Sequence, residues 1–349
     1  MPDLTTLGWD ETLAEQFEPY AGDGLIPGRV AVQHRGAYDV LTELGELRCD
    51  VAGRLYEESR SPADLPAVGD WVAVAARADE DAGTIQAVLP RRTKFSRKTA
   101  WQAAEEQVLA ANVDVVFIVT SLNEDLNLRR LERYLILARE SGAQPVVLLT
   151  KSDLASDRDG ARATVEAIAA DVPVHVLSSL TGEGLDAVRD DLRPGVTAAL
   201  LGSSGVGKST LINTLAGNEL LETQELRSDG QGRHTTSRRE LVQLPGGALV
   251  IDTPGMRELQ LWAADEALEE TFDDVTSLFA QCRFSDCSHE IEPGCAVKEA
   301  IADGTLAPER WESYLKLEAE MAALERRLDK RLASEERKRW RALARQRRR

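Results

Sequence analysis

The residues with the clearest chemical meaning form a glycine-rich run after an apolar segment. Residues 202–209 read GSSGVGKS, follow the apolar run 196–201 and precede a helix-like sequence. This is the pattern G-x-x-x-x-G-K-[ST], in which backbone N–H groups surround phosphates, the lysine reaches the β- and γ-phosphates and the final hydroxyl can bind Mg²⁺. The predicted phosphate site consists of Gly202, Ser203, Ser204, Gly205, Val206, Gly207, Lys208, Ser209 and Thr210.

Two further segments are candidates for the Mg²⁺ side of that site. Residues 252–255 read DTPG after an apolar run. An aspartate at the end of a strand beside a phosphate loop is placed to bind Mg²⁺ through water, which is the role predicted for Asp252. Gly255 can offer a backbone N–H to the γ-phosphate. Thr235 and Thr236 are expected to sense Mg²⁺ and γ-phosphate, and the sequence leaves open which of them faces the ion.

A third motif concerns the base of the nucleotide. Residues 150–153 read TKSD after an apolar run and match the guanine motif [NT]-K-x-D. A carboxylate can accept the paired N1–H and N2–H₂ donors of guanine, which adenine lacks, so Asp153 would select GTP over ATP. Lys151 would lie along the base plane. The predicted base-contacting residues, including a second loop at 178–180, are Thr150, Lys151, Ser152, Asp153, Ser178, Ser179 and Leu180.

The order of these motifs differs from that of ordinary GTPases. The base motif precedes the phosphate loop, so the cycle of motifs is kept but the chain is cut elsewhere, which is a circular permutation. After DTPG stands Met256, where many GTPases carry a glutamine that orients the attacking water. His234 is a candidate to accept the proton of that water. A histidine without a role in a flexible loop is an equal alternative.

Three of the four cysteines are concentrated in a second chemical cluster. Cys282-x4-Cys287-x-His289-x5-Cys295 offers three thiolates and one imidazole within fourteen residues. Such a set suits a closed, tetrahedral, structural Zn²⁺ site without a position for water. The alternative is three buried thiols and an unrelated histidine. We predict one structural zinc ion held by Cys282, Cys287, His289 and Cys295.

The elements that position these residues can be read from periodicity. Short Val-, Leu- and Ile-rich runs between Gly, Pro and Asp make residues 27–92 all-β and typical of a small barrel. Apolar runs alternate with helical segments over residues 105–260, which predicts a parallel sheet with helices on both faces. From residue 265 the chain is expected to be helical around the cysteine cluster. The fold class is thus multidomain α/β.

Charge is distributed unevenly over the 349 residues. The net charge is −17, which argues against a nucleic-acid partner, yet residues 326–349 hold twelve Arg or Lys against three acidic residues. That tail is either an interaction arm or a solvated helix face. The chain has no apolar run of membrane-spanning length, and its acidic, polar N-terminus differs from a secretory signal. We therefore expect no membrane contact and a cytoplasmic location.

Taken together, these motifs resemble one family. GSSGVGKST, GRHTTS, DTPG and TKSD, with a preceding β-region and the following cysteine cluster, resemble the ribosome small-subunit-dependent GTPase A (RsgA) family of circularly permuted GTPases. The resemblance implies an OB-fold barrel, a permuted GTPase domain and a zinc domain. It also implies GTP hydrolysis to GDP, stimulated by the 30S subunit during its late maturation, contact with 16S rRNA, and a role for His234.

The resemblance also sets the expected domain organisation. We predict an N-terminal extension at 1–24, an OB-fold domain at 25–95, a permuted GTPase domain at 96–262, and a zinc-binding helical domain with the basic tail at 263–349. A monomer is expected. Because the body is acidic, the basic segments 91–98 and 326–349 would have to carry phosphate contacts to rRNA.

Two other functions fit parts of the sequence. One is a regulatory GTPase whose target is a protein, with the barrel and the zinc region as protein-binding modules. The other is an ATP-dependent kinase or ATPase built on the phosphate loop, against which Asp153 argues.

Overall fold

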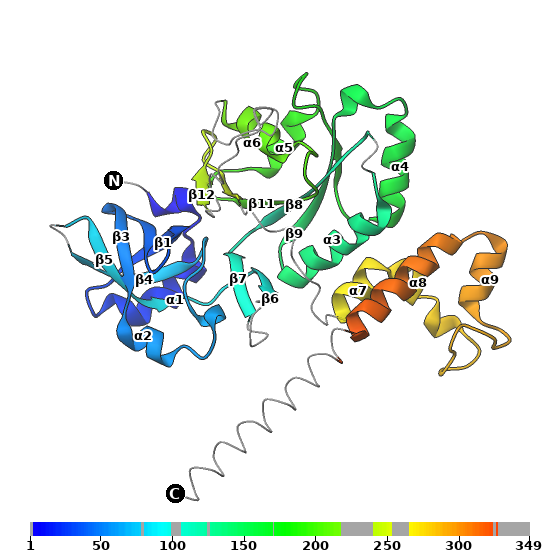
Figure 1. The fold of residues 1–349 in the computed structure, drawn as a ribbon, viewed down its shortest axis with the longest axis horizontal. Coiled ribbons are helices and arrows are strands. Elements are labelled where there is room, and N and C mark those ends of the chain that lie inside the picture. The colour runs from blue at the N-terminus through cyan, green and yellow to red at the C-terminus, as the bar shows by residue number, and fades with distance from the viewer. Residues whose placement is uncertain are drawn as a thin grey trace, which may run out of the picture. The chain divides into compact units, whose positions relative to one another are not determined.

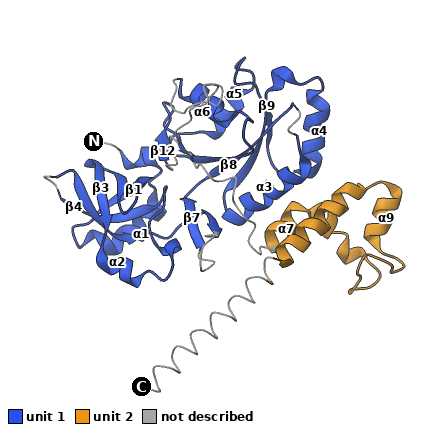
Figure 2. Cartoon of the chain, in the orientation of Figure 1, with its two compact units in different colours: residues 1–260 blue, residues 261–349 orange. Residues whose placement is uncertain are grey.

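The structure is a computed structural model that describes residues 3–77, 80–98, 106–123, 126–169, 171–217, 240–252, 265–323 and 326. The chain divides into two compact units, residues 1–260 and 261–349 (Figure 2). Within the described residues, none of the helices is long and apolar enough to cross a membrane.

The first unit begins with a short helical segment that packs onto the barrel. The 3-10 turn η1 (Leu4–Leu7) and helix α1 (Glu11–Ala21) are each capped by an aspartate, since the Asp10 carboxylate accepts the N–H of Leu13 at 3.0 Å. Between them, the Trp9 ring meets Trp71 of the barrel edge-on at 4.8 Å. Aromatic packing between Trp9 and Trp71 thus holds this N-terminal helical segment against the barrel.

A five-stranded barrel follows, as expected. Its strands are β1 (Ile26–Gln33), β2 (Tyr38–Thr42), β3 (Gly45–Val51), β4 (Trp71–Arg77) and β5 (Ala82–Val88). They pair in the order β1-β2-β3-β5-β4, and β4 pairs back to β1, which closes the barrel with the connectivity of an OB-fold. Inward-facing Val30, Val40 and Ile85 are fully buried in its core.

The all-β expectation for residues 27–92 was wrong at one place. Helix α2 (Gly53–Glu58) and the 3-10 turn η2 (Pro62–Asp64) lie between β3 and β4. The turn is set by local capping, because the Ser61 and Asp64 side chains satisfy each other's backbone N–H groups. Helix α2 has no fully buried side chain, so an apolar pattern could not reveal it.

The remainder of the first unit is an α/β layer (Figure 1). A hairpin of β6 (Lys94–Lys98) and β7 (Glu106–Ala111) leads into it. Its strands are β8 (Val115–Ser121), β9 (Gln144–Thr150), β10 (Val174–Val176), β11 (Thr197–Leu201), β12 (Glu240–Gln243) and β13 (Leu249–Asp252). They lie in the order β10-β9-β8-β11-β13-β12, all parallel except β12, which runs antiparallel to β13.

Helices cover both faces of this sheet, as expected. On one face α5 (Leu185–Asp191) and α6 (Lys208–Ala216) share a buried core with the strands. On the other face α3 (Leu128–Ser141) packs on β8 and β9, and α4 (Arg158–Ile168) packs on α3 and β10. Parallel strands therefore end at one edge, where their following loops gather.

Barrel and sheet are joined by main-chain pairing. Strand β1 pairs with β4 through residues 26–29, and further along the same strand Val32 pairs with Glu240 of β12. The barrel strands and the GTPase strands therefore belong to one hydrogen-bonded sheet.

The second unit is helical around the cysteine loop. It comprises α7 (Asp265–Thr271), α8 (Asp273–Thr276), the 3-10 turn η6 (Phe279–Gln281), α9 (Ala296–Asp303) and helical residues 308–323. Its core contains Phe272 and Tyr314, whose rings meet edge-on at 5.5 Å. Arg310 lies over the Phe272 ring at 4.0 Å and pairs with Asp274, which fixes the last helix onto α8.

Candidate nucleotide and metal sites

The phosphate loop has the backbone that its glycines predict. Gly202 and Gly207 have φ values of 150° and 99°, and a Cβ on Gly202 would lie 2.3 Å from the Val119 carbonyl oxygen. Only glycine fits there. The loop ends at the N-terminus of α6, where the N–H groups of the first turn and the helix dipole favour phosphate. The Lys208 ammonium lies over the loop, donating to the carbonyls of Gly202 and Ser203 at 2.8 and 2.6 Å.

The base motif lies beside this loop although about fifty residues separate the two in sequence. Thr150 ends β9, and its hydroxyl donates to the Val206 carbonyl of the phosphate loop at 2.6 Å. Lys151 then takes a left-handed φ of 57°, which turns the chain into the 3-10 turn η3 (Ser152–Leu154). This hydrogen bond joins the loop suited to phosphates and the loop suited to a base.

The second base loop reaches the same carboxylate. Ser178 follows β10, is fully buried, and its hydroxyl donates to the Asp153 carboxylate at 2.5 Å. The hydroxyl fixes the orientation of the carboxylate, so that it can face two parallel donors of a purine. Ser179 is half-buried, and Leu180 is strongly exposed at the end of this loop.

The predicted Mg²⁺ and catalytic groups are only partly described. Ser209 and Thr210 lie in the first turn of α6. The backbone of Asp252 ends β13, whose Ile251 pairs with Ala199 of β11, so Asp252 stands at the same sheet edge as the phosphate loop. The remaining predicted residues of this group lie outside the described residues: His234, Thr235, Thr236 and Gly255.

Sequence reasoning missed residues that support the base loops. The Glu183 carboxylate accepts hydrogen bonds from the Ser152 hydroxyl and the Arg158 guanidinium, at 3.2 and 3.0 Å. Neither Glu183 nor Arg158 belongs to a recognisable motif, and the sequence carries no signal that would have revealed them. Their partners lie 31 and 25 positions away in the chain.

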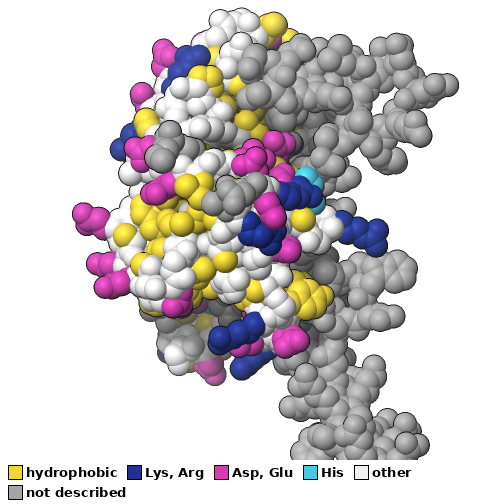
Figure 3. All heavy atoms as spheres, turned by 90° about the vertical axis from the view of Figure 1, so that its left-hand side faces the viewer, with side chains coloured by type: hydrophobic (Ala, Val, Ile, Leu, Met, Phe, Trp, Pro, Cys, Tyr) yellow, Lys and Arg dark blue, Asp and Glu magenta, His cyan; other side chains and the backbone are white. Residues whose placement is uncertain are grey.

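Several charges of the basic segment 91–98, for which we predict phosphate contacts, have acidic partners within the protein. The Arg91 side chain is only 14% exposed and makes a two-pronged ion pair with the buried Asp70 at 2.7 Å. Lys94 pairs with Glu106 at 2.7 Å. Charges of both signs are interspersed on the face that includes the barrel (Figure 3). Arg91 therefore serves the packing of the barrel.

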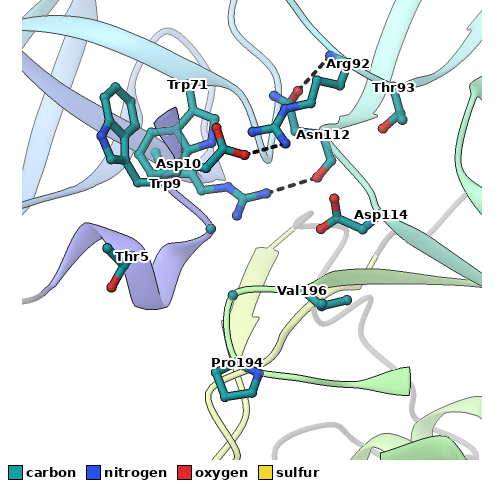
Figure 4. Close-up of a pocket in the computed structure, with 13 residues that line it drawn as sticks. Thr5, Trp9, Asp10, Trp71, Arg92, Thr93, Asn112, Asp114, Pro194 and Val196 are labelled. Atoms are coloured by element: carbon teal, nitrogen blue, oxygen red, sulfur yellow. Dashed lines mark hydrogen bonds and ion pairs between the residues drawn. The ribbon is translucent and has the colours of Figure 1, made fainter. Parts of the chain in front are cut away.

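A pocket of about 270 Å³ lies where η1, the barrel and the start of β11 meet (Figure 4). Arg29 lines it and is 2% exposed; its guanidinium donates to the carbonyls of Leu7 and Asn112 and to the Thr197 hydroxyl. Burial lowers the pKa of Arg29 to about 10, with Asp114 opposing that shift, so it stays protonated near pH 7. The buried guanidinium ties together three segments remote in sequence.

In the second unit the four predicted metal ligands converge. The ligand atoms of Cys282, Cys287, His289 and Cys295 all lie within 4.8 Å of one another. His289 Nδ1 is 3.6 Å from Cys282 Sγ and 3.5 Å from Cys295 Sγ. Tetrahedral zinc with bonds of about 2.3 Å separates its ligands by about 3.8 Å, so the cluster fits a metal ion of this kind. Phe279 stacks on the His289 ring at 4.4 Å and holds it in place.

Fold and site together define a P-loop GTPase whose motifs run in circularly permuted order. The family model described as RsgA GTPase matches residues 88–262. A curated relative from Opitutus terrae, "Small ribosomal subunit biogenesis GTPase RsgA", is 53% identical over 97% of this chain and 95% of its own. A protein of the same name from Syntrophotalea carbinolica is 48% identical over 92% of this chain and 90% of its own.

Solved structures agree with this assignment. YjeQ from Thermotoga maritima matches with a TM-score of 0.64 and 28% identity, over 85% of this chain and 99% of that one. YloQ, described as a circularly permuted GTPase, matches with a TM-score of 0.59 and 26% identity, over 87% and 96% of the two chains. The chain belongs to the RsgA GTPase family, and it is a GTP hydrolase.

Proposed function

We propose that this chain binds the small (30S) ribosomal subunit and hydrolyses GTP to GDP and phosphate during late maturation of that subunit, which stimulates the reaction. The hydrogen bond from Thr150 to Val206 carries the nucleotide part of the proposal, because it holds a guanine-type loop against a phosphate loop. The ribosomal part rests on relatives at 53% and 48% identity that are named small ribosomal subunit biogenesis GTPases.

Each group of residues has a proposed role in nucleotide binding. Asp153 accepts two hydrogen bonds from guanine, and Lys151 lies along the plane of the base. Residues 178–180 form the second loop that contacts the base. Residues 202–210 hold the phosphates. When bound, Mg²⁺ neutralises charge on the β- and γ-phosphate oxygens. Its proposed protein ligands, direct or through water, are Ser209, Thr235 or Thr236, and Asp252.

The catalytic proposal concerns the attacking water. Because Met256 stands where many GTPases carry glutamine, its thioether cannot orient that water. His234 is proposed to accept the proton of the water, with the ribosome ordering or supplementing the groups around it. Separately supplied groups accelerate GTP hydrolysis about 10³–10⁵-fold in other systems. We therefore expect slow turnover by the free protein, and His234→Ala to remove most of the stimulated rate.

Metal, partner and location complete the proposal. The donor set of three thiols and one imidazole favours Zn²⁺, held for structure only. Contact with 16S rRNA is assigned to the basic tail at 326–349 rather than to Arg91, whose charge is used internally. The chain is proposed to act as a monomer in the cytoplasm, where ribosomal subunits are assembled.

GTP turnover with and without purified 30S subunits tests the proposal. We expect strong stimulation in the wild type and a large loss of GTP binding in Asp153→Asn. Filter binding to 30S particles at increasing salt should show affinity falling steeply if phosphates are contacted. Equal turnover with and without 30S subunits, together with salt-insensitive binding, would instead favour a GTPase that acts on a protein target.

A further inference from the structure

Glu183 connects the two loops suited to the base. It lies in the turn that leads from the second base loop into α5. Its carboxylate accepts from the Ser152 hydroxyl of the base motif at 3.2 Å and from the Arg158 guanidinium, which is 3.0 Å from each carboxylate oxygen. Ser152 is fully buried, so its hydroxyl depends on protein partners.

The backbone of Glu183 holds the second loop as well. Its carbonyl accepts the N–H of Ser178 at 2.9 Å, and the Gly182 N–H donates to the Ser178 carbonyl at 2.9 Å. Gly184 has a φ of 73°, and a Cβ there would lie 2.1 Å from the Val176 carbonyl oxygen. Glu183 is thus placed by a turn that only glycine can complete.

Asp153 lies between the two residues that Glu183 holds. Ser152 precedes it in the chain, and Ser178 donates a hydroxyl to its carboxylate at 2.5 Å. We propose that Glu183, with Arg158, is a positioning residue for guanine specificity: it sets the angle at which the Asp153 carboxylate faces the base, acting through Ser152 and Ser178. This rests on the proposed role of Asp153.

The ion pair itself is a poor stabiliser of the fold. The side chains of Arg158 and Glu183 are 39% and 53% exposed, and surface pairs of that kind contribute little to stability. The link from Glu183 to the buried Ser152 is what distinguishes it from an ordinary surface pair. Loss of the carboxylate should therefore alter recognition of the base more than unfolding.

The test compares two diphosphates that differ only in the base. Inosine diphosphate keeps the N1–H of guanine but lacks its 2-amino group, so the ratio of the GDP and IDP dissociation constants reports the contact of the carboxylate with that amino group and cancels the phosphate contacts. We expect Glu183→Ala to weaken GDP binding by about tenfold and IDP binding by much less. Glu183→Gln should lose less than Glu183→Ala, because its amide oxygen can still accept the Ser152 hydroxyl. Competition against a fluorescent guanine nucleotide gives both constants.

Two comparison variants make the outcome decisive. Glu166→Ala removes an ion pair between Arg162 and Glu166 in α4, the helix that also carries Arg158. That pair is 2.7 Å long, and its side chains are 51% and 45% exposed. Its loss should leave both dissociation constants unchanged. Asp153→Asn should abolish the preference for GDP. If it does not, the proposed role of Asp153 fails. If Asp153→Asn behaves as expected but Glu183→Ala keeps the wild-type ratio of the GDP and IDP dissociation constants, or weakens the binding of both ligands equally with a lowered melting temperature, the positioning role of Glu183 is overturned.

Discussion

The hydrogen bond between Thr150 and the phosphate loop allows a quantitative prediction. Thr150 is 2% exposed, and its hydroxyl lies 2.6 Å from the Val206 carbonyl oxygen. A second acceptor, the Thr120 carbonyl, is more distant at 3.3 Å. Thr150→Val keeps the shape of the side chain but removes the proton, so the Val206 carbonyl loses this donor in a buried place.

The expected cost has two parts. Leaving a buried carbonyl without its donor costs about 1–3 kcal/mol. A methyl group also cannot approach an oxygen at the hydroxyl distance of 2.6 Å, so the phosphate loop must move outward by roughly half an ångström. We expect a total loss of about 2–3 kcal/mol. If the loop relaxes in the free protein and must close again on binding, GDP binding weakens by about 30- to 140-fold, since 1.4 kcal/mol is tenfold.

Two measurements capture the whole loss. Titration with a fluorescent GDP analogue gives the part that appears in affinity, and urea unfolding without nucleotide gives the part that appears in stability. Thr150→Ser retains the hydroxyl and should stay close to wild type in affinity. Thr164→Val removes an exposed hydroxyl on α4 that bonds only within its helix, and should change neither quantity. A summed loss below about 0.5 kcal/mol for Thr150→Val would refute the reasoning.

Three further predictions concern Gly202, Arg29 and the cysteine cluster. Gly202→Ala places a Cβ 2.3 Å from the Val119 carbonyl oxygen at a φ of 150°, so GDP affinity should fall on the order of a hundredfold, whereas Gly246→Ala, which meets nothing within 4 Å, should bind normally. Arg29→Met removes the donor of several buried acceptors, so the free energy of unfolding of the first unit, measured in urea, should fall by about 2–4 kcal/mol. Arg54 is exposed, and Arg54→Met should leave the midpoint of urea unfolding unchanged. Elemental analysis should find one metal ion per chain, and chelation should increase hydrogen exchange in the second unit but not in the first.

The parts of the fold that follow local patterns could be predicted from the sequence. The apolar run 196–201, the glycine-rich run 202–209 and the helix-like sequence after it predict a strand, a loop and a helix from neighbouring residues. The four residues of the cysteine cluster are equally close in sequence. The alternating runs of the barrel and the buried runs of the sheet likewise identified their own strands. These signals need only residues that are close in the chain.

The parts that depend on remote partners could not be predicted. Arg29 resembles an ordinary solvent-facing residue of a strand, yet its acceptors come from residues 112 and 197. Arg91 looked like a phosphate contact because nothing near it in sequence indicates that Asp70 would be buried beside it. A charged side chain acquires its role from the partner that folding supplies, and single-sequence patterns do not contain that pairing.

The pairing of β1 with β12 has a consequence for the order in which this chain matures on the ribosome. Strand β1 (Ile26–Gln33) leaves the exit tunnel early, and the barrel can close once β5 has been synthesised, because β5 lies between β3 and β4 and β4 pairs back to β1. The outer end of β1 must wait about two hundred residues for Glu240. During translation the nascent barrel therefore carries an uncovered strand end, and β12 attaches the completed barrel to the nucleotide-binding half only after about two thirds of the chain has been synthesised.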